Sequence, residues 1–219
     1  MLQMDLTATN VSLLPTLART PRSIFTLIDA NAPDRRDLEA RIRAGFGAHF
    51  GASISGFMPQ LALYRHRSGK SGVIGVRSAW NEALFLEHYL DIPVQNVIAD
   101  AAGQPVSRSR IAEVGQFVVD DPEIVGSFFR DLVPFLRAEG FDWVCFTGTN
   151  RVRAHLKRIG FHGLPVASAA ADRAAPTGDR WGNYYDHEPL VIIGKLDDPE
   201  GGWCEPAVTT NFPANAAFA

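Results

Sequence analysis

Residues Ile111–Val119 read Ile-Ala-Glu-Val-Gly-Gln-Phe-Val-Val, and they form the centre of the predicted fold. Its density of Val and Ile predicts a β-strand. The residues that follow, Asp120-Asp121-Pro122, supply a capping carboxylate and a proline suited to the first position of a helix. A helix is therefore predicted over 122–139, and after Gly140 the almost entirely apolar sequence FDWVCF predicts a buried strand at 141–146. A strand, a helix and a strand in this order predict a sheet covered by helices.

The flanking sequence adds further elements of both kinds. Residues 35–50 place Leu38, Ile42, Phe46 and Phe50 four apart, which predicts an amphipathic helix. The other predicted elements are strands at 23–30 and 190–194, a hairpin of strands 61–65 and 73–79, short helical segments at 85–90 and 93–102, a basic helix at 150–159 and a loop of small residues at 167–178. We expect an α/β fold with a mixed central sheet in one domain at 23–198, an N-terminal arm at 1–22 and a C-terminal tail at 199–219.

The composition is typical of a globular protein and narrows its setting. The 219 residues carry 21 Lys and Arg against 24 Asp and Glu, so the net charge of −3 does not favour nucleic acid as a partner. Cys145 and Cys204 are too few for a disulfide framework or a Cys-based zinc site, which favours a reduced, cytoplasmic setting. The sequence shows no secretory signal and no apolar run long enough to span a membrane. Peripheral contact with a membrane stays open.

Several segments resemble a known family of enzymes. The predicted elements between 111 and 161 look like the second half of a GNAT-type acyltransferase, and the acidic strand is similar to that of the acyl-homoserine-lactone synthases. The chain from about 23 to 197 resembles the thermostable hemolysin family. The segments that carry the resemblance are Phe85-Leu-Glu-His-Tyr-Leu-Asp91, Glu113-Val-Gly115, Phe146-Thr-Gly-Thr149 and Trp181-Gly-Asn-Tyr-Tyr-Asp-His-Glu-Pro189.

The resemblance implies a GNAT-like fold, a mixed central sheet flanked by helices, in which two strands splay apart around a thioester. The implied function is an N-acyltransferase that moves a medium or long fatty acyl chain from acyl-carrier protein, or from acyl-CoA, to an amino acid or amino-acid derivative. No tightly bound cofactor is implied. Two alternatives stay open: a lactone synthase that uses S-adenosylmethionine, from whose Glu-x-Ser-Arg-Phe motif residues 113–117 depart, and a non-catalytic, membrane-active protein.

Glu113 is the predicted catalytic base. Acyl transfer to an amine needs a group that removes a proton from the attacking ammonium. Glu113 lies in a Val- and Ile-rich strand, where partial burial raises the pKa of a carboxyl group toward the useful range. The alternative is a structural ion pair with Arg108 or Arg110.

Glycine is unusual inside a strand and often marks a bulge or the close approach of a ligand, which draws attention to Gly115. Backbone N–H groups released there, at Gly115, Gln116 or Phe117, are candidates to hold the thioester carbonyl. The alternative is an ordinary bulge without a role in binding.

Two charged segments bear on the identity of the acyl donor. GNAT enzymes that use CoA hold its pyrophosphate at the helix that follows this strand, but here Asp120, Asp121 and Glu123 would repel phosphate, which favours a carrier-protein donor. An acidic carrier protein would be attracted by the cations of the 150–159 helix, unless these form only a solvated helix face. These cations are Arg151, Arg153, Lys157 and Arg158.

The segment 181–189 concentrates polar aromatic residues without helical or strand periodicity, which indicates a site. Tyr184 or Tyr185 is the predicted acid for the leaving thiolate, and Trp181 is expected to pack as a lid. Asp186 and His187 are candidates to bind the amine or to orient the base. Scattered histidines give no metal site, and Cys145 is expected to be a buried, inert thiol.

The other expected substrate contacts come from earlier in the chain. Phe57-Met58-Pro59 and Phe85, Leu86, Tyr89 and Leu90 are expected to line the acyl side of the site. The alternative is ordinary core packing, which also gives apolar residues this spacing. Arg77 and Glu87 are candidates to hold the polar end of the amine substrate, and Thr147 of the Phe-Thr-Gly-Thr segment is a further candidate for substrate binding.

Overall fold

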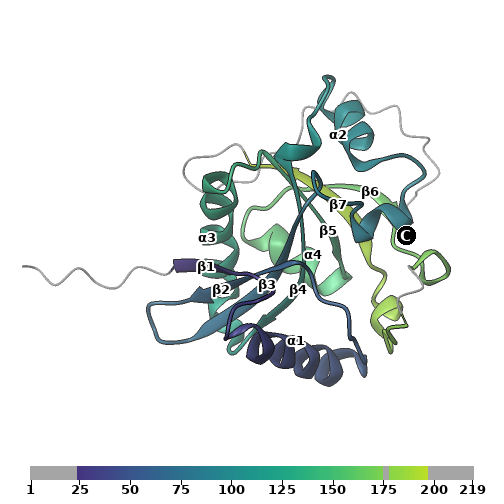
Figure 1. The fold of residues 1–219 in the computed structure, drawn as a ribbon. Helices are drawn as coiled ribbons and strands as arrows, with labels where there is room; N and C mark the ends of the chain where they lie inside the picture. The colour runs from purple at the N-terminus through teal and green to yellow at the C-terminus, as the bar shows by residue number, and fades with distance from the viewer. Residues whose placement is uncertain (1–23, 175–177, 197–219) are drawn as a thin grey trace, which may run out of the picture.

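The computed structural model describes residues 24–174 and 178–196. Within them a seven-stranded sheet has the order β1-β2-β3-β4-β5-β7-β6 (Figure 1). Neighbouring strands run antiparallel except β4 and β5, which are parallel. The strands are β1 (Ile24–Ile28), β2 (Gln60–Arg65), β3 (Ser71–Ser78), β4 (Ile111–Val119), β5 (Trp143–Gly148), β6 (Leu164–Ser168) and β7 (Leu190–Lys195).

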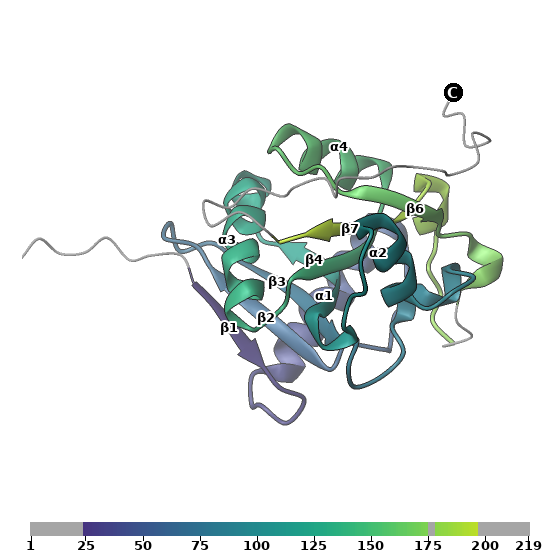
Figure 2. The ribbon, with the colours of Figure 1, turned by 90° about the horizontal axis from the view of Figure 1, so that it is seen from above.

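Helices cover both faces of this sheet (Figures 1 and 2). The α-helices are α1 (Arg35–Phe50), α2 (Val94–Ala102), α3 (Val125–Ala138) and α4 (Asn150–Arg158). Short 3₁₀ helices are η1 (Phe85–Tyr89), η2 (Arg108–Arg110), η3 (Pro122–Ile124), η4 (Ala171–Arg173) and η5 (Tyr184–His187). Side chains of α3 and α4 share one apolar core with one face of the sheet. On the other face α1 and α2 each form a separate core, so this face is covered at two ends with a space between.

The parallel pair β4 and β5 separates after a short paired section. Pairing joins Ile111 to Trp143, Ala112 to Val144 and Glu113 to Cys145, and it stops there. Beyond Glu113, β4 continues to Val119 beside β3, whereas β5 continues to Gly148 beside β7. The strands therefore diverge into a wedge-shaped opening in the sheet, as expected.

A bulge in β4 changes the direction of the strand at the start of the opening. The pairing of β3 with β4 passes from Val73–Val118 to Gly75–Gly115, so β4 contains one residue more than β3 in this interval. Gln116 takes up the irregularity with a positive φ of 55°, a conformation that side chains other than glycine rarely adopt. Because a bulge interrupts the regular ladder, it supports the separation of β4 from β5.

The predicted elements agree with most of the structure. The helix at 35–50 and the strand at 111–119 have the predicted bounds. The helix predicted over 122–139 divides into η3 and α3, and Asp121 caps η3 by accepting a hydrogen bond from the Glu123 N–H at 2.9 Å. The strand predicted at 141–146 begins later, at Trp143. Strand β6, at the edge of the sheet, was not predicted, and part of it falls in the segment expected to be a loop.

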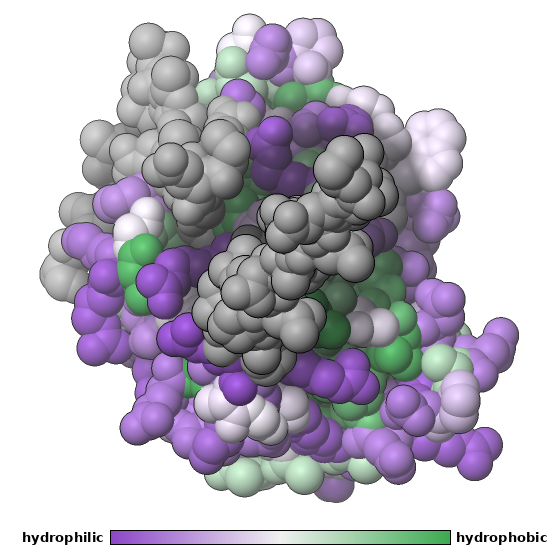
Figure 3. All heavy atoms as spheres, turned by 90° about the vertical axis from the view of Figure 1, so that its left-hand side faces the viewer, coloured by the Kyte–Doolittle hydropathy of each residue, from purple (hydrophilic) through white to green (hydrophobic). Residues whose placement is uncertain are grey.

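The surface of the molecule mixes hydrophobic and hydrophilic side chains (Figure 3). Figure 3 shows the side of the molecule that lies at the left of Figure 1, where hydrophobic side chains occupy smaller areas among hydrophilic ones. No helix in residues 24–174 or 178–196 has the length and apolar character needed to cross a bilayer. The arm predicted at 1–22 and the tail predicted at 199–219 lie outside the described residues.

Candidate functional site

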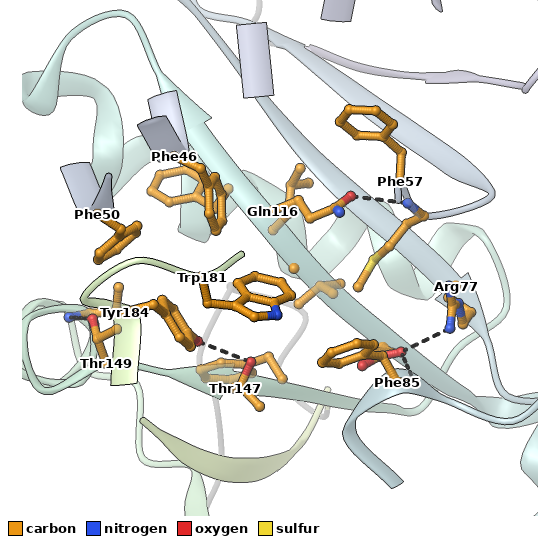
Figure 4. Close-up of a pocket in the computed structure, with 18 of the residues that line it drawn as sticks. Phe46, Phe50, Phe57, Arg77, Phe85, Gln116, Thr147, Thr149, Trp181 and Tyr184 are labelled. Atoms are coloured by element: carbon orange, nitrogen blue, oxygen red, sulfur yellow. Dashed lines mark hydrogen bonds and ion pairs between the residues drawn. The ribbon is translucent and has the colours of Figure 1, made fainter. Parts of the chain in front are cut away.

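A cavity of about 230 Å³ occupies the opening between β4 and β5 (Figure 4). Its lining side chains belong to the cores on both faces of the sheet, so the cavity extends through the opening. Predicted site residues in its wall are Arg77, Phe85, Glu113, Gly115, Gln116, Phe117, Thr147, Trp181, Tyr184 and Tyr185. The fold therefore brings residues of β3, β4, β5 and the 181–185 segment, which are far apart in the sequence, together around one cavity.

Glu113 is the buried acid of this cavity. It is 3% exposed, and it occupies the last position of β4 that pairs with β5. Its two carboxylate oxygens accept hydrogen bonds at 2.9 Å from the backbone N–H groups of Phe85 and Leu86, in the first turn of η1. Burial raises the pKa of Glu113 to about 7, against the opposing effect of these two N–H groups and of Arg77. A carboxyl group with this pKa accepts and releases protons at neutral pH.

The cation beside Glu113 is not one of those expected. Arg108 is bound to Glu87 at 2.8 Å, and Arg110 is bound to Asp142 at 2.7 Å, so the predicted alternative of an ion pair with either arginine is wrong. The partner is Arg77, whose Nη1 lies 4.0 Å from Glu113 Oε2. Arg77 stands directly opposite Glu113 in the pairing of β3 with β4, which puts both side chains on the same face of the sheet.

Gly115 has a packing role beside its place at the bulge. A Cβ on Gly115 would lie 2.8 Å from Met58 Cε, and a Cβ on its cross-strand partner Gly75 would lie 2.8 Å from Met58 Sδ. The two glycines therefore make room for the Met58 side chain, which lines the cavity as expected. The bulge itself falls on the next residues of β4, so the explanation of Gly115 as the bulge residue was only partly right.

The side chains of Gln116 and Phe117, at the bulge, contact different parts of the protein. The Gln116 amide accepts a hydrogen bond from the Met58 N–H at 3.0 Å (Figure 4). It also donates one to the Gly56 carbonyl at 2.7 Å. This side chain fixes the 56–58 segment against β4. Phe117 packs on the rings of Phe128 and Phe129 in α3. The side chain of Gln116 is thus engaged by the protein, and its backbone remains the candidate for contact with a thioester.

The 181–185 segment forms an aromatic wall of the cavity. The ring of Trp181 lies 6.3 Å from that of Phe46, 5.8 Å from that of Phe85 and 5.6 Å from that of Tyr184, and it is central in Figure 4. Trp181 therefore connects the side chains of α1 with those of η1. The packing expected of Trp181 and one tyrosine is present in the structure.

The two tyrosines present their hydroxyl groups to different partners. Tyr184 is 8% exposed and donates a hydrogen bond to Thr147 Oγ1 at 3.2 Å, and burial raises its pKa to about 12. The hydroxyl oxygen of Tyr185 lies 2.8 Å from that of Tyr89, and burial also raises the pKa of Tyr185. Both phenols are therefore protonated at neutral pH.

The wall is held in place by the segment that follows α1. Ser53 and Arg180 exchange backbone hydrogen bonds of 2.7 and 3.0 Å, and the Asn183 N–H donates to the Phe50 carbonyl at 2.9 Å. Gly182 has a φ of +57°, and a Cβ there would collide with the Phe50 carbonyl oxygen. Asp179 accepts hydrogen bonds from the N–H and the hydroxyl of Ser55.

Lining residues that sequence reasoning missed include Phe46, Phe50 and Asp179. The two phenylalanines have the spacing of an ordinary helix face, so their sequence pattern does not separate a cavity wall from a core. Asp179 precedes the aromatic run that drew attention to this part of the chain. Its hydrogen bonds to Ser55 depend on a contact that no local pattern reveals.

The exceptions among the predicted substrate contacts are Glu87, Asp186 and His187, which do not line this cavity. Burial opposes ionisation of Glu87, but hydrogen bonds from Arg108 and from two backbone N–H groups outweigh it and lower the pKa of Glu87. Glu87 therefore ties η1 to the loops around it, and it lies outside the wall of the cavity. Asp186 is exposed, and His187 packs edge-on against the ring of Phe50 at 5.6 Å.

The basic helix α4 presents only part of its charge to solvent. Arg151, Lys157 and Arg158 are exposed. Arg153 donates hydrogen bonds to the carbonyl oxygens of Gly148, at 3.0 Å, and of Glu188, at 2.6 Å. Its guanidinium links α4 to the ends of β5 and η5, so it is engaged within the protein and differs from the other three cations.

The carboxylates after β4 are engaged in local structure. Asp120 is paired with Arg41 at 2.7 Å, and it accepts hydrogen bonds from the Ser71 N–H and hydroxyl. Asp121 is paired with Lys70 at 2.8 Å. The hydrogen bonds from Lys70 and from the Glu123 N–H lower the pKa of Asp121. The two carboxylates therefore lie at the start of the helix, where a phosphate would otherwise be attracted.

Cys145 is buried next to this site and is not a nucleophile. It is fully buried in β5, and burial raises the pKa of its thiol well above the ordinary range. The thiol lies 3.4 Å from the Ala112 carbonyl. In the part of the chain that the structure describes, no group of three His, Cys, Asp or Glu side chains has an arrangement that could hold a metal ion.

The sheet, its opening and its helices define the fold of GNAT-like acyltransferases. The chain belongs to the thermostable hemolysin family, whose pattern matches residues 28–199. Among curated proteins, none matches this sequence.

Solved structures similar to this chain include an N-acyl amino acid synthase and acyl-homoserine-lactone synthases. FeeM, an N-acyl amino acid synthase from uncultured soil microbes, has 16% sequence identity and a TM-score of 0.52, over 82% of this chain and 93% of FeeM. The acyl-homoserine-lactone synthase LasI has 12% identity and a TM-score of 0.49, over 80% of this chain and 91% of LasI. MesI, a CoA-dependent acyl-homoserine-lactone synthase, has 12% identity and a TM-score of 0.48, over 81% of this chain and 91% of MesI.

Proposed function

We propose that this protein is an N-acyltransferase that moves a medium or long fatty acyl chain from a thioester to the amine of an amino acid or amino-acid derivative. The observation that carries the proposal is the opening between β4 and β5, with a buried carboxyl group where the strands separate and an apolar cavity beyond it. The family and the fold shared with FeeM support the same class of reaction.

Glu113 acts first, as the general base. An amine at neutral pH arrives mostly as its ammonium ion, which has no lone pair for attack. Transfer of one ammonium proton to Glu113, whose pKa is about 7, gives the neutral amine. The two N–H groups from η1 hold the carboxylate in a fixed orientation while leaving lone pairs on both oxygens for the substrate.

The amine nitrogen then forms a bond to the thioester carbonyl carbon, and the carbonyl oxygen becomes an oxyanion. Backbone N–H groups at the bulge, at Gly115, Gln116 and Phe117, are the proposed donors to this oxygen, because a bulge leaves donors outside the regular ladder. When the oxyanion collapses, the carbon–sulfur bond breaks. The products are the amide and the thiol of the pantetheine arm.

A tyrosine hydroxyl completes the proton balance. The nitrogen of the tetrahedral adduct carries one proton more than the amide needs, and the departing sulfur needs one. With a pKa of about 12, the phenol of Tyr184 is a weaker acid than a thiol, whose pKa is about 8.5. It therefore serves as a relay, donating its proton to sulfur while it accepts one from nitrogen. Tyr185 is the second candidate for this role.

The fatty chain is placed in the apolar part of the cavity. Beyond the opening, the lining side chains are mostly aromatic and aliphatic, which suits an alkyl chain because burial of each methylene contributes about 0.8 kcal/mol. Those on the side of α3 and α4 include Phe129, Leu132, Phe146, Val152, Leu156 and Phe161.

Acyl-carrier protein is the proposed donor, with acyl-CoA as the alternative. The carboxylates of Asp120 and Asp121 occupy the region at which GNAT enzymes are expected to hold the CoA pyrophosphate, and like charges repel there. The exposed cations of α4, Arg151, Lys157 and Arg158, offer an acidic carrier protein a docking surface.

The proposal is tested by release of free thiol from acyl-carrier-protein and acyl-CoA thioesters, in the presence of a panel of amino acids and amino-acid esters. We expect amine-dependent thiol release, together with an N-acyl product detected by mass spectrometry. Vesicles without substrates serve as the parallel assay. Leakage caused by the bare protein, with no amine-dependent thiol release from any donor, would support a membrane-active protein instead.

A further inference from the structure

Arg77 is the cation nearest to the proposed base. It faces Glu113 across the β3–β4 pairing and lines the same cavity. In Figure 4 it lies beside Phe85, whose backbone N–H holds the Glu113 carboxylate. Its side chain is only 19% exposed, so most of the guanidinium and its stem is surrounded by protein.

The hydrogen bonding of Arg77 within the protein is weak for a group with five N–H donors. Its Nη1 donates to the Ala83 carbonyl at 3.5 Å, the limit of a hydrogen bond. Its Nε is buried and has no hydrogen-bond partner among the described residues, although a Glu82 oxygen lies 3.4 Å away. Glu82 is 48% exposed, and the Glu113 oxygen is at 4.0 Å. By contrast, Arg108 next to this region makes five hydrogen bonds of 2.6–3.2 Å.

We infer that Arg77 binds the free α-carboxylate of the acceptor, so that the substrate is an unesterified α-amino acid. This inference rests on the proposed function. The planar guanidinium donates two parallel hydrogen bonds to a carboxylate, a geometry that an amide or ester group does not reproduce. A partly dehydrated cavity strengthens such a pair.

The spacing of the two side chains matches the two charges of an amino acid. In an α-amino acid the ammonium and the carboxylate are attached to the same carbon, so they reach partners only a few ångström apart. Arg77 Nη1 and Glu113 Oε2 are 4.0 Å apart and on one face of the sheet. An acceptor bound to both places its nitrogen at the base, because its carboxylate fixes the other end.

The test compares free amino acids with their primary amides. With the best acceptor of the panel, we expect the wild-type protein to show a KM at least about 10-fold lower for the free acid than for its amide, because a hydrogen-bonded ion pair is lost with the amide. Arg77→Met should remove this difference by raising the KM of the acid more than that of the amide. Arg77→Lys should restore part of it, since a lysine keeps the charge without the fork.

Arg130→Met, at an exposed position of α3, is the matched control and should keep the wild-type ratio. The ratio of the two KM values is used because Arg77 also acts on Glu113, and that effect is the same for both acceptors. Equal KM values for acid and amide in the wild-type protein would overturn the inference while leaving acyl transfer intact. If no amine of any kind promotes thiol release, the proposed function itself fails.

Discussion

The two ends of β4 carry carboxyl groups that the fold treats in opposite ways. Glu113, at the paired end, is buried, and burial raises its pKa to about 7. Asp121, just beyond the other end, lies at the surface, where hydrogen bonds from Lys70 and from the Glu123 N–H lower its pKa. The same chemical group is thus a proton acceptor at one end of the strand and is kept ionised at neutral pH at the other. Environment, rather than residue type, assigns the roles.

The largest expected effect comes from removing the first of these groups. Glu113→Gln keeps the size of the side chain but removes the base, so amine-dependent thiol release should fall about 10²- to 10⁴-fold. The melting temperature should change little, because the lost hydrogen bond to η1 is offset by the loss of a buried charge. Asp121→Asn, at the other end of the strand, is the matched control and should retain most of the activity. Full activity in Glu113→Gln would remove Glu113 from the mechanism.

A smaller loss is expected at the tyrosine relay. Tyr184→Phe should lower kcat about 10- to 100-fold, because the departing sulfur loses a hydrogen-bond donor. Tyr185→Phe should have a smaller effect, since Tyr184 is the one bound to Thr147 on β5, beyond the point where β5 leaves β4. Rates are measured as thiol release at saturating acceptor. Equal, wild-type rates in both variants would show that the proton reaches sulfur without either phenol.

The surface charges on α4 should affect only the carrier-protein donor. Replacing Arg151 and Arg158 by Glu should raise the KM for acyl-carrier protein ~10-fold at low salt and weaken its dependence on salt. The KM for an acyl-pantetheine without carrier protein should stay the same. A rise in KM for both donors would indicate a folding defect, and unchanged kinetics for both would identify this helix as a solvated face.

The last expected effect is on stability, rather than on activity, as a function of pH. The pKa of Glu113 is higher in the folded protein than the value of about 4.3 in an unfolded chain, so the folded state binds the extra proton. Glu113 should therefore reduce stability as the pH rises from about 4.3 to about 7, and Glu113→Gln should abolish this slope in denaturant titrations. Asp121 has the opposite sign: its contribution is present above the unfolded pKa and is lost as the pH falls through its lowered pKa.

Local patterns were sufficient for the elements around the opening. The helix at 35–50 and the strand at 111–119 follow from their spacing and composition, and the departure of β5 from β4 agrees with the family resemblance. Strand β6 was missed because Leu-Pro-Val-Ala-Ser is short and includes a proline, which an edge strand tolerates. It forms through pairing with β7, and such pairing is not encoded in the local sequence.

The site was predicted less completely, because it also depends on contacts between segments that are distant in the sequence. Glu113 was singled out correctly as a buried acid, but its neighbour was sought in Arg108 and Arg110, close in sequence, whereas the sheet register supplies Arg77. Gly115 was noticed, but its reason, the Met58 side chain, comes from another loop. The spacing of residues in the sequence therefore does not predict roles that depend on tertiary contacts.

The role of Glu113 as the base can be measured through the pH dependence of kcat/KM for acyl transfer. With a carrier-protein thioester and the best free amino acid, kcat/KM should rise as the pH increases through about 7, as Glu113 loses its proton. The residual activity of Glu113→Gln should not show this rise. A wild-type profile with no inflection near 7, or the same inflection in Glu113→Gln, would contradict the assignment of Glu113 as the base.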